Sequence, residues 1–294
     1  MDEQRVQRIG GRIVFAGCVR DCAEHLPAVL NNLAAIAALF DEAAFVFAEN
    51  DSKDNTVAIL HDWATRHLGV TVIQLHGLTD EPTRGLRLEM ARNAYVAFIR
   101  QDAALSQYDW LVVVDMDEPN KPPVDIDTVR RAFAFLAAEP NRVAGFANQT
   151  GIYYDVWTLR HPKLMPGDAW EAVFDHKFRH RCTAEEAFDA AFRPHIYRIA
   201  PSRSPVEVNS AFGGLGIYKL PAVLRNPHPY RGSKAKILRN SKETRAYRWQ
   251  VCEHVHFNEG LRLEGGRLYI LPFLINCDTS GYVIPPTGYR GMLF

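Results

Sequence analysis

Asp115 and Asp117, near the middle of the chain, have the spacing of a paired carboxylate site for a divalent cation. They directly follow the apolar run WLVVV at residues 110–114, which is typical of a buried strand. Side chains two residues apart on an extended chain point to the same side, so both carboxylates can converge on one ion. Such oxygen ligands suit Mg²⁺ and Mn²⁺, and the ion can stabilise a leaving diphosphate. The competing interpretation is a solvated acidic turn after the strand.

Strand-like and helix-like segments alternate in the part of the sequence that leads to this carboxylate pair. Short apolar runs predict strands, and apolar residues at helical spacing predict the helices between them. The strands are expected at residues 12–17, 43–48, 70–75 and 110–114, and the helices at residues 24–40, 54–68 and 87–101. Apolar strands separated by helices predict an α/β fold, with a mostly parallel sheet and helices on both faces.

Polar clusters follow three of these strands at their carboxyl ends, at residues 18–21, 49–52 and 115–118. Ligands of parallel α/β sheets bind at this edge of the sheet. The sequence therefore predicts one binding edge, at which residues far apart in the chain come together.

The composition is that of a folded protein with a small-molecule partner. The 294 residues are 47% hydrophobic and 23% charged, which is enough for one substantial core. Lys plus Arg and Asp plus Glu number 34 each, so no global field attracts nucleic acid. No run approaches the roughly 18 apolar residues of a membrane span. The polar N-terminus lacks a signal-peptide pattern, so a cytoplasmic protein is expected.

Four stretches between about residues 12 and 120 together resemble the GT-A glycosyltransferase superfamily, and its capsular and viral members most. The segment IVFAGCVRD resembles the nucleotide-binding start of these enzymes, and FVFAENDSKDNT is similar to their END-S-x-D-x-T segment. RLEMARNAYV resembles the Ala-Arg-Asn helix that precedes the metal motif, and VVVDMDE supplies that motif. The set of four is far more specific than the aspartate pair alone.

This resemblance implies a GT-A (Rossmann-like) fold, with a mixed, mostly parallel sheet flanked by helices and an irregular acceptor-side lobe. We expect one domain over residues 1–294, with a nucleotide-binding half at about 12–120 and an acceptor and metal-completing half at about 150–294. The implied activity is metal-dependent transfer of a hexose from a UDP- or GDP-sugar to an acceptor hydroxyl, as in polysaccharide biosynthesis. The acceptor is expected to be a glycan or another hydroxyl compound, and the cofactor Mn²⁺ or Mg²⁺.

The resemblance also assigns residues to the nucleotide and the donor sugar. Guanidinium groups match phosphate oxygens in pairs, and glycine permits close approach of the backbone. Asp51 is expected at the uridine or ribose, although capping of the following helix is a competing role. The segment VNSAFGGLGIYK at residues 208–219 resembles the donor-sugar segment. The full set is Gly17, Arg20, Glu49, Asn50, Asp51, Arg84, Arg92, Asp115, Met116, Asn209, Ser210, Gly213 and Gly214.

A third metal ligand is expected in HVHFN, at residues 254–258, which resembles the late His-containing strand of these enzymes. In an extended segment, His254 and His256 share one face and Glu253 lies on the other. The match at HFN selects His256 as the ligand beside Asp115 and Asp117. A histidine ligand favours Mn²⁺ over Mg²⁺. The competing interpretation is a pair of buried or surface histidines.

The catalytic base is left open between Glu253 and Asp155. Glu253 is expected to point away from His256, and Asp155 lies in the aromatic segment YYDVW. The acidic pair that these enzymes carry after their glycine turn is missing. Here the corresponding glycine segment at residues 213–216 is followed by Ile217 and Tyr218. Inversion or retention at the sugar is therefore left open as well.

Aromatic and basic residues after residue 150 fit either an acceptor site or core packing, because aromatic faces stack on sugar rings. They are Tyr154, Trp157, Arg160 and Trp170. The tail at residues 285–290 fits a lid whose Arg290 reaches phosphate, or an ordinary disordered end.

Three rival functions share parts of this pattern. An aspartate-based phosphatase also has two aspartates after a strand, but they follow its first strand. In this sequence the pair follows the fourth predicted strand. A nucleotidyltransferase needs a Gly-rich phosphate loop after the first strand, and GCVRDCAEHLP has a single glycine. A non-catalytic carbohydrate- or nucleotide-binding module would keep the fold without turnover.

Overall fold

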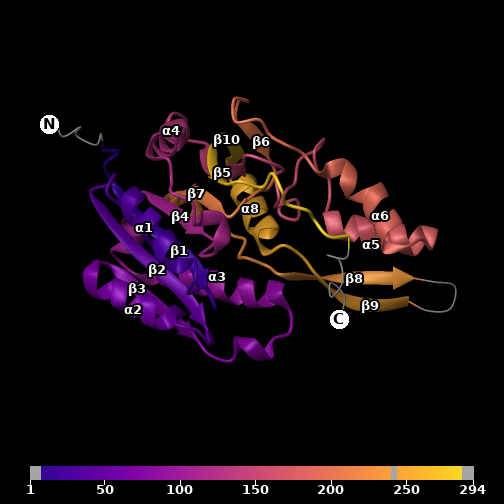
Figure 1. Ribbon diagram of the computed structural model, residues 1–294, viewed down its shortest axis with the longest axis horizontal. Helices are drawn as coiled ribbons and strands as arrows, with labels where there is room; N and C mark the ends of the chain where they lie inside the picture. Colours follow the sequence, from indigo (N-terminus) through magenta and orange to yellow (C-terminus); the bar gives the residue numbers. More distant parts are fainter. Residues whose placement is uncertain (1–7, 240–243, 287–294) are drawn as a thin grey trace.

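The computed structural model describes residues 8–239 and 244–286, and its centre is one eight-stranded sheet (Figure 1). The strand order is β3-β2-β1-β4-β7-β5-β10-β6. The strands are β1 (Arg12–Val19), β2 (Glu42–Asn50), β3 (Val70–Leu75), β4 (Trp110–Val114), β5 (Arg142–Gln149), β6 (Val206–Val208), β7 (Leu215–Lys219) and β10 (Arg267–Cys277).

The sheet is mixed and mostly parallel, as expected. Strands β3, β2, β1 and β4 run parallel to one another, and β10 runs parallel to β5. Strand β7 lies antiparallel between β4 and β5, and β6 is antiparallel to β10. The antiparallel β7 thus brings the glycine segment before it next to the carboxyl end of β4.

Helices cover both faces of the sheet, because the central strands are apolar on both sides. Phe15, Phe47 and Val112 pack with α1, α2 and α4, whereas Val14 and Val113 pack on the opposite face with α3, α7 and α8. The helices are α1 (Leu26–Ala37), α2 (Thr56–Arg66), α3 (Arg84–Gln101), α4 (Ile126–Ala137), α7 (Leu220–Arg225) and α8 (Glu253–Leu263). Short 3₁₀ turns are η1 (Leu78–Asp80), η2 (Leu105–Gln107), η3 (Glu118–Asn120) and η4 (Arg193–His195).

The second half of the chain is more regular than the sequence suggested. It supplies β6, β7 and β10 to the main sheet and α8 to one face. Only part of it forms a side lobe, which Figure 1 shows at one end of the molecule. This lobe consists of α5 (Ala169–His180), α6 (Ala184–Ala191) and the hairpin β8 (Ser233–Arg239) and β9 (Thr244–Gln250).

The expectation of a strand at HVHFN is wrong, because these residues lie in α8. The buried residues of α8 include His254, Phe257, Asn258 and Leu261, which is helical spacing. A five-residue comparison is too short to show that period. The predicted strands at 70–75 and 110–114 are confirmed to the residue, and α3 begins three residues earlier than predicted. Within the parts that the structure describes, no helix is both long and apolar enough to cross a membrane.

A buried lysine joins the hairpin to α5 in the side lobe. The Nζ of Lys236 lies 2.7 Å from Oε1 of Glu171 and 2.8 Å from Oδ1 of Asp175, and its side chain is 9% exposed. Burial alone would raise the pKa of Glu171, but hydrogen bonds from Lys234 and Lys236 outweigh it and lower that pKa. Stability from Glu171 is therefore present above its unfolded pKa and lost as the pH falls through the folded value.

We expect Lys236→Met to lower the free energy of unfolding by about 1–3 kcal/mol at pH 7, because Asp175 loses its contact with Lys236 and Glu171 keeps only the more exposed Lys234. The loss should shrink below about pH 4, where the carboxylates become protonated. Urea denaturation at both pH values measures it. The control is Arg66→Met, whose ion pair with Asp62 is exposed and should contribute less than about 0.5 kcal/mol. Equal losses in the two variants would contradict the role of Lys236.

Candidate active site

Two adjoining cavities lie at the carboxyl ends of β1, β2 and β4, beside the start of α3. The first contains both aspartates of the motif and several arginines, with lining residues Cys18, Val19, Arg20, Cys22, Asn50, Arg84, Arg87, Leu88, Ala91, Asp115, Met116 and Asp117. The second shares Arg84, Leu88 and Asp115 with the first. It is otherwise lined by Arg92, Tyr154, Asp155, Trp157, Thr158, Phe212, Cys252, Glu253 and His254. The first cavity contains residues from all three polar clusters, and the second adds residues from the second half of the chain.

The turn that carries the aspartates is fixed against the glycine segment before β7. The amide of Asp115 donates to the carbonyl oxygen of Gly214 at 2.8 Å. The Nδ2 of Asn120 donates to the carbonyl oxygens of Asp115 and Gly214, at 2.8 and 2.7 Å. These bonds set the direction in which the two carboxylates enter the cavity.

Arg92 ties Asp115 to the first residue of α8. Its Nη2 lies 3.1 Å from Oδ1 of Asp115, and its Nε lies 2.7 Å from Oε1 of Glu253. The side chains of Arg92 and Glu253 are each 3% exposed. The guanidinium also lies over the rings of Phe212 and Tyr230, at 5.1 and 5.8 Å. With its nitrogens engaged in this way, Arg92 is placed to position Asp115 rather than to bind a diphosphate.

The two aspartates fit a divalent cation. Burial raises the pKa of Asp115 to about 7, although Arg92 acts against this. Asp117 lies at the open side of the cavity, and desolvation by surrounding atoms raises its pKa too, with Arg84 acting against this. Desolvation outweighs these arginines at both carboxylates, so a divalent cation in contact with them would stabilise their charged form, and oxygen ligands of this kind suit Mn²⁺ and Mg²⁺. Asp115 and Asp117 therefore satisfy the donor chemistry predicted for them.

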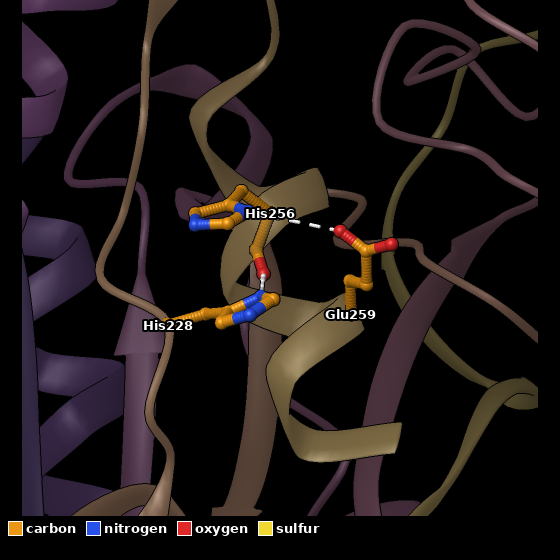
Figure 2. Close-up of side chains that lie close together, drawn as sticks. All are labelled: His228, His256 and Glu259. Carbon is orange, nitrogen blue, oxygen red and sulfur yellow. Dashed lines mark hydrogen bonds and ion pairs between the residues drawn. The ribbon is translucent and has the colours of Figure 1, made fainter. Parts of the chain in front are cut away.

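His256 is not among the residues that line either cavity, in the parts of the chain that the structure describes. It lies with His228 and Glu259 (Figure 2). The strand that was expected to place His254 and His256 on one face is absent, because both residues are in a helix. His254 lines the second cavity instead, stacked on Phe212 with ring centroids 3.9 Å apart. Burial and Arg92 lower the pKa of His254, so its imidazole is neutral at pH 7.

Both candidate bases line the second cavity. Glu253 is held by Arg92, with the second oxygen of its carboxylate 3.9 Å from Sγ of Cys252. Asp155 accepts from the amide of Gly213 at 2.9 Å and from Oγ1 of Thr158 at 2.7 Å. Burial raises the pKa of Asp155 to about 6, and these two hydrogen bonds act against the rise. Asp155 thus combines a fixed position with a pKa near neutrality.

Several residues predicted for the nucleotide line the first cavity: Arg20, Asn50, Arg84 and Met116. The Nδ2 of Asn50 is buried and has no hydrogen-bond partner among the described residues, so it is available to a ligand. Gly17 is not among the lining residues, but it contacts Met116, which is. A Cβ there would lie 2.6 Å from Cγ of Met116, so glycine is what allows Met116 to pack over β1.

Two of the predicted nucleotide residues hold the backbone of neighbouring loops. The carboxylate of Asp51 accepts from the amides of Gly77 and Thr79, at 3.0 and 2.9 Å. Glu49 is buried and accepts from the amide of Ser52 at 2.9 Å. Asp51 does not cap α2, whose N-cap is Asn55. Its observed contacts hold the backbone of the loop at residues 77–79.

The predicted donor-sugar segment divides into two parts. Gly213 and Gly214 have positive φ, and a Cβ at Gly214 would lie 2.7 Å from the hydroxyl of Tyr154, which lines the second cavity. Ser210 is buried and its hydroxyl accepts from Nδ2 of Asn258 at 3.0 Å, while the amide of Asn209 donates to the carbonyl of Arg160. Among the described residues, Asn209 and Ser210 belong to the support behind the cavities and not to their lining.

The sequence did not single out Thr158, Phe212 or Cys252 for the site. Their hydrogen bonds and ring contacts link Asp155, His254 and Arg92, and nothing in their types alone signals this. Of the aromatic cluster, Tyr154 and Trp157 line the second cavity, whereas Trp170 is buried against Phe188 and Phe192. Arg290 of the predicted lid lies outside the described residues.

Comparison with solved structures identifies this architecture. A mannosyltransferase from Pyrobaculum calidifontis, solved with GDP-Man and Mn²⁺, has a TM-score of 0.51 and 14% identity over 95% of this chain. The fold is that of the GT-A glycosyltransferases. The TarS segment 1–349 of S. aureus has a TM-score of 0.48 and 14% identity, over 91% of this chain and 60% of that one.

This GT-A chain spans 59% of the length of the mannosyltransferase that it matches. No protein-family model matches its sequence, and neither does any curated protein. At 14% identity the likeness shows the fold alone.

We expect Arg92→Leu to lower the free energy of unfolding by about 3–5 kcal/mol, because it leaves the buried Glu253 without its partner. The double variant Arg92→Leu with Glu253→Leu should lose less than Arg92→Leu alone, since no buried unpaired carboxylate remains on α8. Urea denaturation of the set measures both. The matched control is Arg100→Leu, an exposed arginine on the same helix, which should stay within about 0.5 kcal/mol of the parent. A loss in Arg92→Leu no larger than in the control would refute the buried ion pair.

Proposed function

We propose that this protein is a metal-dependent glycosyltransferase that moves a hexose from a nucleoside diphosphate sugar to an acceptor hydroxyl. The observation that carries this is the position of Asp115 where two cavities of different chemistry meet, with Asp117 beside it in the first cavity. The first is rich in arginine and suits a nucleoside diphosphate. The second carries aromatic rings and carboxylates and suits a sugar and its acceptor. The mannosyltransferase of similar fold was solved with GDP-Man and Mn²⁺, which agrees with this division.

In this mechanism Asp115 and Asp117 hold the cation, which when bound neutralises charge on the leaving diphosphate. Arg84 lies where the cavities meet and binds a phosphate oxygen, with Arg20 and Arg87 further along the first cavity. Asn50 offers its unpartnered Nδ2 to the nucleoside. Arg92 acts as a positioning residue because it fixes the direction of the Asp115 carboxylate.

Asp155 is the proposed base for the acceptor hydroxyl. Its carboxylate is fixed by Gly213 and Thr158, and it shares the second cavity with Asp115. Glu253 is committed to Arg92, so we assign it to positioning. Tyr154 and Trp157 form the aromatic wall against which a sugar ring packs. We propose a glycan as the acceptor because this wall suits a second sugar ring.

We expect UDP or GDP to raise the melting temperature only when Mn²⁺ or Mg²⁺ is present, and Asp117→Ala to abolish the shift. A ligand at 100 times its Kd stabilises the folded state by about 2.7 kcal/mol, which is a shift of several degrees. The control is Asp62→Asn, a carboxylate that is 68% exposed and distant from the cavities in sequence and element. If no nucleotide shifts the folded parent protein with either metal, the proposed function is wrong.

We expect Asp155→Asn to lower kcat by about 10²- to 10⁴-fold while the nucleotide–metal thermal shift is retained, since a base acts on the acceptor and not on the nucleotide. The rate of the parent enzyme should rise with pH through about 6, where Asp155 loses its proton, and the variant should lack this limb. Asp189→Asn, in an exposed ion pair, is the control. A variant with parental kcat, or one that retains the limb, would rule Asp155 out as the base.

A further inference from the structure

A second cluster of metal-binding side chains lies apart from the lining of the two cavities. His228, His256 and Glu259 each offer one ligand atom, and these atoms all lie within 4.8 Å of one another. Figure 2 shows the two imidazoles one above the other, with the Glu259 carboxylate directed toward His256. The ring centroids are 4.0 Å apart, and Nδ1 of His256 lies 3.6 Å from Oε2 of Glu259.

The backbone around His228 is built to lie against α8. A Cβ at Gly260 would lie 2.0 Å from Oδ1 of Asn226 and 2.6 Å from Cβ of His228, so only glycine permits this approach. Asn226 then fastens the contact. Its Nδ2 donates to the carbonyl of Phe257 at 2.9 Å, and its Oδ1 accepts from the amide of His228 at 3.0 Å.

The tautomer of His228 is set in the way that metal sites require. Its Nδ1 lies 3.1 Å from the carbonyl oxygen of His256, and a carbonyl can only accept. In the neutral imidazole Nδ1 therefore carries the hydrogen, and Nε2 keeps its lone pair for a cation.

We propose that His228, His256 and Glu259 bind a zinc-class transition metal ion, with water as the fourth ligand. The residues of this cluster suit a different ion from the one held by Asp115 and Asp117. Two imidazoles and one carboxylate favour Zn²⁺, whereas an oxygen-only pair favours Mn²⁺ or Mg²⁺. His256 and Glu259 are three residues apart on α8, so they project from the same side of the helix.

Binding requires a small closure of the cluster. Ligand atoms around tetrahedral Zn²⁺, with bonds of about 2.0–2.2 Å, lie roughly 3.4 Å apart. The His256–Glu259 pair, at 3.6 Å, nearly meets this spacing. The remaining pairs, at up to 4.8 Å, must approach by up to about 1.4 Å, and the imidazoles must rotate out of their stack so that both lone pairs meet one point. Glu259 can follow without disturbing the core, because its side chain is 60% exposed.

Such an ion would clamp the segment at residues 226–232 to α8. The same segment is already tied to α3 by paired hydrogen bonds between Asn93 and Tyr230, and to α8 by the amide of Arg231 on the carbonyl of Glu253. Because α3 and α8 carry Arg92 and Glu253, the ion would strengthen the attachment of the two helices that meet behind the active site.

The test is titration of the chelator-treated, full-length protein with Zn²⁺, and with Co²⁺ as a spectroscopic substitute. We expect Zn²⁺ to raise the melting temperature, and Co²⁺ to give the visible absorption of a low-symmetry, histidine-containing site. His228→Gln, His256→Gln and Glu259→Gln should each weaken the affinity about tenfold or more. His61→Gln, an exposed histidine on α2, should leave it unchanged.

Two further readouts separate this site from the carboxylate pair. We expect His228→Gln and Glu259→Gln to keep the Mn²⁺–nucleotide response, and Asp117→Ala to keep the Zn²⁺ response. The proposal is overturned if Zn²⁺ affinity survives in His228→Gln and Glu259→Gln, or if Asp117→Ala abolishes it. Loss of the Mn²⁺–nucleotide response in His256→Gln would instead assign His256 to the pair Asp115 and Asp117.

Discussion

The buried guanidinium of Arg92 is the contact on which the arrangement of this site depends. It has carboxylates from two other elements within hydrogen-bonding distance, Asp115 at the end of β4 and Glu253 at the start of α8. A charge this deeply buried is tolerated only when it is paired, so α3, β4 and α8 must all be docked together. The ion pair thereby links the folding of the second half of the chain to the geometry of the first.

The sheet topology places the glycine segment at residues 213–214 beside the anchored Asp115. Strand β7 runs antiparallel between β4 and β5, so the glycines before it lie against the turn that carries Asp115. The amide of Gly213 in turn holds Asp155. One glycine segment therefore positions both the proposed metal ligand and the proposed base, and its positive φ angles explain why other residue types are unsuited there.

Two strands of the first half of the chain were predicted on different grounds: Trp110–Val114 is buried and forms a continuous apolar run, whereas Val70–Leu75 is a half-buried edge strand rich in β-branched residues. Val70–Leu75 and Trp110–Val114 were correct to the residue. A cavity lies at the edge of the sheet where binding was predicted, and the position of that edge follows from strand direction alone. The partners of Asp51 and Arg92 could not be predicted, because Thr79 and Glu253 lie 28 and 161 residues further along the chain. The error at HVHFN arose from judging five residues whose helical period appears only over all of α8.

Helix α8 connects the two clusters that the structure offers to cations. Its first residue, Glu253, holds Arg92 and through it Asp115, while His256 and Glu259 lie three and six residues further along, close to His228. A helix of eleven residues moves as one body, so any shift of its first turn against Arg92 also changes the distance between His256 and His228. The segment at residues 226–232 contacts both α3 and α8 and resists such a shift. The attachment of this segment to α8 is therefore part of what holds the carboxylate pair in position.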